Sequence, residues 1–143
     1  MKVFIENEAG SDQKNIYNET TLEYRKTYTV SRKYPYPYGF ILDTISGDGD
    51  SLDCFVITDQ PLKTGTIVEV EPIALMEQIE DQEEDHKILA VLPGELGEVT
   101  DVVKTTLKEF TQHVFDHIEG KQMRIGNFYG KDAAEALIEK SKK

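Results

Sequence analysis

The first two-thirds of the chain alternates short apolar runs with turn residues, a pattern that predicts β-strands. The segment 66–71 (Thr-Ile-Val-Glu-Val-Glu) alternates polar and apolar side chains, as a strand with one buried face does. Many of the runs are rich in β-branched or aromatic residues and are bounded by Gly, Pro, Asn or Asp. We predict strands at Val3–Glu6, Leu22–Val30, Tyr38–Ile41, Asp53–Thr58, Thr66–Met76 and His86–Val91.

The last third of the chain changes to helical periodicity. Apolar residues at spacings of three and four form one stripe, made of Val103, Leu107, Phe110, Val114 and Ile118. Thr100 or Asp101 is suited to cap the start of this helix, and Gly120 to end it. A second, shorter helix is predicted over Asp132–Lys140.

The order of these elements predicts the fold class. Strands followed by helices favour an α+β fold, mainly β, in which a barrel-like sheet is covered by helices. No internal repeat or linker divides the chain, and 143 residues suit one domain, spanning 1–143, with one sizeable core.

Charge and composition narrow the function. Sixteen Lys and Arg against 27 Asp and Glu give a net charge of −11, which repels nucleic acid and anionic membranes, so we expect neither as a partner. No apolar run is long enough to span a bilayer and no signal-peptide pattern opens the chain, so we expect a cytoplasmic protein. The single Cys54 is interpreted as a buried small hydrophobe.

Three aspartates form the strongest local signal. Asp48, Asp50 and Asp53 fall within six residues, and carboxylates so close together repel one another unless something compensates. Mg²⁺ is a natural compensation because it prefers oxygen ligands. An ordinary solvated acidic turn is the alternative. An EF-hand calcium loop fits badly, since Asp53 occupies the position where that loop needs glycine.

Two further segments carry candidate chemistry. In the run 34–38 (Tyr-Pro-Tyr-Pro-Tyr), the prolines favour a rigid, extended chain, and the tyrosines are either core aromatics or hydroxyl donors to phosphate. In the acidic run 80–87, an exposed hairpin loop is the simplest interpretation. Asp85 and Lys87 nevertheless alternate at the start of a strand, where they can share a face and bind a metal ion with its phosphate.

Together these motifs resemble the family I soluble inorganic pyrophosphatases. The resemblance rests on Tyr34-Pro-x-x-Tyr38-Gly, Asp48-Gly-Asp50-Ser-Leu-Asp53 and Glu80-x4-Asp85-x-Lys87, in that order, and extends from Val3 to the C-terminal helices. It implies a five-stranded OB-like β-barrel with α-helices packed outside and the site in its mouth. It also implies hydrolysis of pyrophosphate to two phosphates with several Mg²⁺ ions, Mn²⁺ being an alternative metal, and a homo-oligomer, commonly a hexamer in bacterial relatives.

The resemblance also implies roles for individual residues. Asp50 matches the carboxylate that accepts a proton from the attacking water. The matches to metal-binding positions are Asp48, Asp53 and Asp85 as direct ligands, Glu80 with its neighbour Asp81 at a further ion, and Glu6 through metal-bound water. The matches to phosphate-binding positions are Lys14, Lys26, Tyr38 and Lys87, with Tyr34 as a second tyrosine near the site.

Several departures fall on the phosphate side of this pattern. Ile16 stands where the family has a glutamate, and Lys26 where it has an arginine, although Arg25 is adjacent. Ile118 and Glu119 stand where the family has Tyr-Lys, with Lys121 nearby to compensate. Ser51 replaces the usual proline of the aspartate motif.

These departures keep other functions open. One alternative is a paralogue that hydrolyses another phosphoanhydride, such as a nucleotide diphosphate. A second is a catalytically silent metal- or phosphate-binding regulator, against which the retained Asp50 speaks. A nucleic-acid-binding OB domain is the third, and the acidic charge disfavours it.

Overall fold

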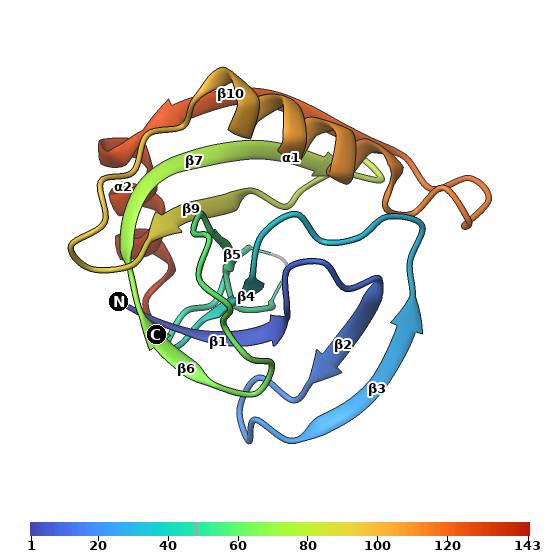
Figure 1. Ribbon diagram of the computed structural model, residues 1–143, viewed down its shortest axis with the longest axis horizontal. Coiled ribbons are helices and arrows are strands. Elements are labelled where there is room, and N and C mark those ends of the chain that lie inside the picture. Colours follow the sequence, from blue (N-terminus) through green and yellow to red (C-terminus); the bar gives the residue numbers. More distant parts are fainter. Residues whose placement is uncertain (48) are drawn as a thin grey trace.

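The computed structural model describes residues 1–47 and 49–143, and within them the chain forms ten strands and two helices (Figure 1). In chain order these are β1 (Lys2–Asn7), β2 (Gln13–Tyr17), β3 (Tyr24–Thr29), β4 (Tyr38–Ile41), β5 (Asp53–Val56), β6 (Ile67–Glu69), β7 (Glu71–Glu80), β8 (Glu83–Glu84), β9 (Lys87–Val91), α1 (Asp101–His113), β10 (Met123–Gly130) and α2 (Lys131–Ser141).

The main sheet curls into a ring because one long strand region takes part in it twice. Its strand order is β10-β7-β9-β5-β4-β1-β6, and β6 is joined to β7 by the single residue Val70. β6 pairs with β1 while β7 pairs with β9, so β1, β4, β5, β9 and the β6–β7 region close a five-membered circuit. Only the β5–β9 pair in this circuit is parallel. The five-stranded OB-like barrel expected from the resemblance is confirmed.

Side-chain alternation along the strands separates two cores. The inner core contains residues from every member of the circuit, namely Val3, Ile5, Ile41, Leu52, Cys54, Val56, Val70, Leu75, Ile88 and Ala90, with Ala134 of α2 packed against them. The outer core lies beneath α1, where Leu107 and Phe110 pack on Phe55, Leu89 and Met76. Cys54 is fully buried, as predicted.

A separate hairpin, β2–β3, covers another part of the outer surface (Figure 1). Tyr17 of β2 packs edge-on against Phe4 of β1, with ring centroids 4.8 Å apart, and Phe4 contacts Phe40 of β4. Strands β4, β5 and β9 run between this hairpin and α1. α1 covers Phe55 and Leu89 on the outer face of these strands, and a gap remains between α1 and the hairpin.

The predicted strands are confirmed in part. β2, β8 and β10 were not predicted, because each carries mostly polar or exposed residues and no sustained apolar alternation. The predicted strand Leu22–Val30 begins only at Tyr24, since Leu22 has a φ of 63° and belongs to the preceding turn. The single strand predicted at Thr66–Met76 is divided at Val70, and its second part runs on to Glu80.

The first helix is shorter than its apolar stripe indicated. Thr100 caps its start by accepting a hydrogen bond from Val103 N–H, as predicted. The helix ends at His113, however, and Val114 is its C-cap. Ile118 lies beyond the helix and is exposed, so its place in the predicted stripe is wrong. Among the described residues, neither helix combines the length and the apolar character needed to cross a membrane.

Candidate active site

The carboxylates of Asp53 and Asp85 are joined by a buried lysine. Asp53 and Lys87 begin β5 and β9 and are direct partners in the parallel pairing. The Lys87 ammonium donates hydrogen bonds to Asp53 Oδ2 at 2.5 Å, to Asp85 Oδ2 at 2.9 Å and to the Tyr38 hydroxyl at 3.1 Å. The prediction that Asp85 and Lys87 share a face is confirmed. Burial by itself would lower the pKa of Lys87, but the two carboxylates raise it above its ordinary value.

These side chains alternate with the inner core and therefore face outward. Asp53 and Phe55 point to the outer face of β5, whereas Cys54 and Val56 belong to the inner core. The site expected in the mouth of the barrel therefore lies at strand ends, with Asp53 facing outward from β5. The residues line the gap on the outer barrel face between α1 and the β2–β3 hairpin.

The gap holds a cleft of about 510 Å³. Its described lining comes from the barrel, the hairpin and the aspartate loop: Glu6, Lys14, Ile16, Tyr17, Asn18, Glu19, Thr20, Arg25, Tyr38, Gly49, Asp50, Asp53, Glu80 and Asp85. A smaller hollow of about 160 Å³ adjoins it and includes Lys87 and Tyr34. The cleft and the adjoining hollow together combine several carboxylates with the three basic side chains of Lys14, Arg25 and Lys87.

Glu6 is the most perturbed carboxyl of the cleft. It lies near the end of β1 and is 8% exposed. Burial, followed by the charge of Asp53, raises the pKa of Glu6 to about 8, and Lys14 opposes the shift. Burial and the charge of Asp53 also raise the pKa of Asp85, against the effect of Lys87. A divalent cation among these oxygens would offset the mutual repulsion.

The two tyrosines of the Tyr-Pro-x-x-Tyr-Gly motif are both buried. The Tyr34 ring packs on Tyr38 and on Phe110 of α1, with centroid distances of 5.4 and 4.7 Å. The Tyr38 hydroxyl accepts from Lys87, and Lys14 Nζ lies 5.4 Å from the Tyr38 ring centroid. The tyrosines therefore serve both as core aromatics and as part of the site lining. Gly39 follows because any Cβ there would clash with the backbone carbonyl of Phe4.

The aspartate motif forms a loop at the edge of the cleft. Asp48 lies outside the described residues, while Asp50 and Asp53 both line the cleft. The backbone carbonyl of Asp50 accepts from both Ser46 N–H and Ser46 Oγ, at 2.7 and 2.9 Å. Gly49 has a φ of 89°, a conformation that favours glycine at this turn. The loop thus presents its carboxylates from a hydrogen-bonded turn.

Glu80 and Asp81 begin the predicted acidic hairpin. Asp81 and Gln82 both have positive φ, as a two-residue hairpin turn between β7 and β8 requires. Glu80 lines the cleft, but Asp81 is exposed and accepts a hydrogen bond from Gln122 N–H at 2.9 Å. Lys121 donates to Glu80 at 3.0 Å and lies 3.2 Å from Asp81. That backbone bond and Lys121 lower the pKa of Asp81.

A bulge in the hairpin changes which basic residue of β3 reaches the cleft. Ile16 pairs with Lys26, but Tyr17 pairs with Tyr24, so Arg25 is an extra residue on β3. Arg25 lines the cleft. Lys26 is not among its described lining residues, and its ammonium lies 5.2 Å from the Tyr28 ring centroid. The register shift thus brings the arginine, not the predicted Lys26, to the site.

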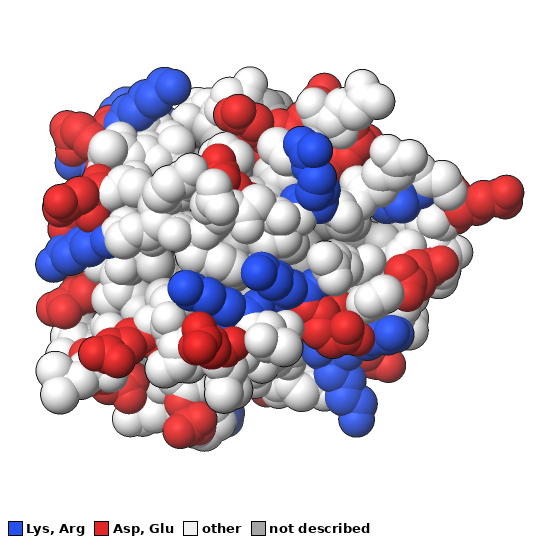
Figure 2. Space-filling model, turned by 90° about the horizontal axis from the view of Figure 1, so that it is seen from above, with Lys and Arg blue, Asp and Glu red and all other residues white. Residues whose placement is uncertain are grey.

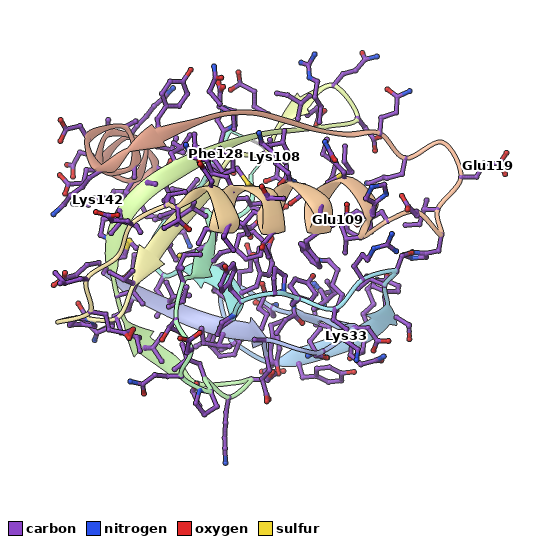
Figure 3. The ribbon with its side chains drawn as sticks, turned by 45° about the horizontal axis from the view of Figure 1, so that its top comes forward. Lys33, Lys108, Glu109, Glu119, Phe128 and Lys142 are labelled. Carbon is purple, nitrogen blue, oxygen red and sulfur yellow. The ribbon has the colours of Figure 1, made fainter. Side chains whose placement is uncertain are left out.

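The connection between α1 and β10 does not bring Ile118 or Glu119 to the cleft. Glu119 projects outward from the tip of this connection, as Figure 3 shows, and Ile118 is exposed. Lys121 is held by Glu80 and Asp81. Ile118 and Glu119, at the positions where the resemblance expects Tyr-Lys, therefore do not line the site. Phe115 and Met123 line the smaller hollow on this side instead.

One carboxylate of the cleft was missed by the motif reasoning. Glu19 lies in the β2–β3 turn, and its carboxylate accepts a hydrogen bond from Ser51 N–H at 2.9 Å. Burial raises the pKa of Glu19, and the backbone bond from Ser51 opposes the shift. Glu19 belongs to no motif, and only the folded hairpin brings it to the aspartate loop.

The donor set suits a hard divalent cation. Asp50, Asp53, Asp85 and Glu6 offer carboxylate oxygens within one cleft, and Mg²⁺ prefers such ligands. Within residues 1–47 and 49–143, no three potential ligand groups are already close enough to hold one ion. The Lys87 ammonium instead provides the positive charge between Asp53 and Asp85.

Comparison with known proteins agrees with this geometry. A family model described as inorganic pyrophosphatase matches residues 3–143. The inorganic pyrophosphatases of Nanoarchaeum equitans and Methanosarcina acetivorans are 32% and 33% identical, over 96% and 98% of this chain and 92% and 89% of theirs. Crystal structures of inorganic pyrophosphatases from Thermus thermophilus and Neisseria gonorrhoeae have TM-scores of 0.87 and 0.89 at 26% identity. The two structural matches cover 97% and 99% of this chain, and 87% and 88% of the Thermus and Neisseria chains, respectively. The chain belongs to the inorganic pyrophosphatase family.

Proposed function

We propose that this protein hydrolyses inorganic pyrophosphate to two phosphates in the cleft lined by the barrel, the β2–β3 hairpin and the aspartate loop. The observation that carries the proposal is the convergence of Glu6, Asp53 and Asp85 with Lys14 and Lys87 on one outer face of the barrel. Family membership supports the reaction. The combination of carboxylates for metal ions and cations for phosphate supports the location.

Several Mg²⁺ ions, or Mn²⁺ in their place, are part of the proposal. We assign Asp48, Asp53 and Asp85 as direct ligands, Glu80 and Asp81 to a further ion, and Glu6 to metal-bound water. When bound, such ions neutralise charge on the phosphate oxygens and lower the pKa of a water molecule. Asp81 supports this assignment least, because its carboxylate faces Gln122 and Lys121.

Asp50 is proposed as the general base. Its carboxylate accepts a proton from the attacking water while the water oxygen bonds to one phosphorus, and the bridging P–O bond then breaks to release the second phosphate. Catalysis of this kind depends on positioning and on charge neutralisation more than on covalent chemistry. The position of Asp50 on the cleft wall suits it to the task.

The basic and phenolic groups of the cleft are proposed to bind the phosphates. Lys14 and Lys87 supply ammonium donors, and Tyr38 a hydroxyl, with Tyr34 packed beneath it. The sequence analysis assigned a phosphate-binding role to Lys26. We propose Arg25 for this role instead, since Arg25 lines the cleft. Its guanidinium offers the two parallel donors that a phosphate accepts.

A substituted diphosphate has little support as the substrate. That expectation was motivated by Ile118, which is exposed beyond α1 and is not among the described residues of the cleft. The curated relatives of the chain considered above are named inorganic pyrophosphatases.

The decisive experiment measures phosphate release from pyrophosphate with millimolar Mg²⁺. Asp50→Asn should lower kcat by roughly 10²–10⁴-fold, the range that a general base contributes. Glu119→Gln, which changes a carboxylate that points away from the molecule, is the matched control and should keep wild-type activity. A wild type that releases no phosphate, or an Asp50→Asn variant as fast as the control, contradicts the proposal.

Assembly and location complete the proposal. We propose a homo-oligomer, with a hexamer as the form that the family resemblance suggests, in the cytoplasm. Large apolar side chains such as Leu96 and Val102 are exposed in the single chain. Figure 2 shows charges of both signs spread over one face, without a continuous basic stripe. Light scattering coupled to size-exclusion chromatography gives the oligomeric state directly.

A further inference from the structure

The turn between β2 and β3 holds Glu19 in a defined position. Asn18 Oδ1 accepts hydrogen bonds from the N–H groups of Thr20 and Thr21, both at 2.9 Å. Asn18 N–H donates to the Glu23 carbonyl at 2.8 Å, and Leu22 N–H donates to the Asn18 carbonyl at 2.7 Å. The turn is thus tied on both sides of Glu19, whose half-buried side chain extends into the cleft.

Glu19 meets the aspartate loop at Ser51. The Ser51 N–H, 32 residues away in the sequence, donates to Glu19 Oε1 at 2.9 Å, and Ser51 is only 8% exposed. Ser51 stands between Asp50 and Asp53, at the position where the aspartate motif usually has proline. Proline has no N–H to donate, so this bond exists only because the chain departs from the motif.

Other hydrogen bonds of this loop run to the segment that precedes it. Ser46 bonds the Asp50 carbonyl, and Leu52 N–H donates to Thr44 Oγ1 at 3.0 Å. Thr44 and Ser46 both precede the loop and follow β4. The Glu19–Ser51 bond, in contrast, joins the aspartate loop to the hairpin. It therefore links two walls of the cleft.

We infer that Glu19 is a positioning residue that holds the aspartate loop, and with it Asp50 and Asp53, against the hairpin. The inference deepens the proposed function, because it assigns a residue that sets the geometry of its general base and of one metal ligand. Glu19 acts through the Ser51 N–H and needs no contact with the substrate. Small losses of position at such a site have large effects on rate.

The test separates the hydrogen bond from the charge. Glu19→Ala removes both, Glu19→Gln keeps an acceptor oxygen without the charge, and Ser51→Pro removes the donor. Ser51→Ala keeps the N–H and is the reference for Ser51→Pro, while Glu23→Ala removes an exposed carboxylate of the same hairpin and serves as control. Circular dichroism and thermal unfolding identify any variant that fails to fold.

Two readouts are needed. The first is the Mg²⁺ dissociation constant of the metal-free protein, measured by isothermal titration calorimetry without substrate. The second is the separation of kcat from KM for pyrophosphate. We expect Glu19→Ala to weaken Mg²⁺ binding and to lower kcat, each by about tenfold, as for a lost hydrogen bond to a charged group. KM should change less, and Glu19→Gln should lie between Glu19→Ala and the wild type.

The double variant provides the sharpest criterion. If Glu19 and Ser51 act through one bond, Glu19→Ala with Ser51→Pro should be no weaker than the worse single variant. Additive losses overturn the inference, and so does a Glu19→Ala variant that binds Mg²⁺ and turns over like Glu23→Ala. If Ser51→Pro does not fold, a Glu19→Gln variant as impaired as Glu19→Ala overturns it, because the charge alone then matters.

The calorimetric arm keeps this inference distinct from the proposed function. A wild type that binds Mg²⁺ but does not hydrolyse pyrophosphate would refute the function. The same order of Mg²⁺ affinities among the variants would still support the positioning role of Glu19. If the wild type is active and the Glu19 variants have the same Mg²⁺ affinity and kcat as the wild type, the proposed function stands and the positioning role of Glu19 is refuted.

Discussion

On one side of the cleft, Asp53 and Lys87 stand at the starts of two strands that pair in regular parallel register, and Asp85 lies two residues before Lys87. We call these three residues the strand wall. On the other side, Lys14, Glu19 and Arg25, the hairpin wall, come from a hairpin with a bulge and a turn. Regular register converts sequence spacing directly into position, so the strand wall follows from the motif. The hairpin wall depends on one extra residue and on the geometry of one turn.

The largest effect is expected at the strand wall. Asp53→Asn removes a proposed metal ligand and one of the two carboxylates bonded to the buried Lys87 ammonium. We expect kcat/KM for pyrophosphate to fall by roughly 10²–10³-fold or more, in the range of losses seen when a group that stabilises transition-state charge is removed. Asp59→Asn, which alters an exposed carboxylate shortly after β5, is the control. A loss of less than tenfold would remove Asp53 from the metal site.

A smaller effect is expected at the hairpin wall, and it identifies the residue that the bulge presents. Arg25→Ala should raise KM for pyrophosphate by about 10- to 100-fold, the cost of one or two charge-assisted hydrogen bonds. Lys26→Ala should change KM by less than about twofold, because Lys26 lies against the Tyr28 ring. If Lys26→Ala raises KM and Arg25→Ala does not, Lys26 binds pyrophosphate, as the regular register expected from the sequence implies. The bulge would then not determine which basic residue reaches the substrate.

The same contrast explains which parts of the molecule were predictable. The run of β-branched and aromatic residues predicts β4, β5 and β9, and the spacing of Asp85 and Lys87 places both on one face. β2 was not predictable from the apolar pattern, because only Ile16 and Tyr17 in it are large and apolar. The position of Arg25 could not be predicted, since sequence periodicity does not reveal where a bulge adds a residue.

Irregular connections account for the remaining differences. The apolar stripe of α1 includes Ile118 at the right spacing, but the helix ends at His113 and the chain turns away. Glu19 carries no motif signal, because its partner Ser51 is brought near only by tertiary structure. The barrel was predictable from strand content and motif. Its closure through Val70, between β6 and β7, depends on long-range pairing that the local sequence pattern does not show.

The buried Glu6 should make the stability of the metal-free protein depend on pH. Its folded-state pKa is raised from 4.5 to about 8, so between these values the folded state binds more protons than the unfolded state. The free energy of unfolding should therefore decrease as pH rises from about 4.5 to 8, by at least about 1 kcal/mol. Urea unfolding with EDTA measures this slope.

Glu6→Gln supplies the matched variant for that measurement. It keeps the size of the side chain and removes its titration, so its stability should vary less with pH over the same interval. An unchanged slope in Glu6→Gln would assign the pH dependence to other carboxyls of the cleft, such as Asp85, whose pKa is also raised by burial.

The smallest effect is expected for Lys121, which tests whether the α1–β10 connection belongs to either wall. Lys121 is bonded to Glu80 and Asp81 in a partly exposed position, where ion pairs contribute up to about 1 kcal/mol. Lys121→Ala should lower the free energy of unfolding by no more than that, and less at high salt. KM for pyrophosphate should change by less than about threefold, because Lys121 is already engaged by two carboxylates. A tenfold rise in KM would mean that Lys121 leaves Glu80 for the substrate, and phosphate binding would then be shared between the hairpin wall and this connection.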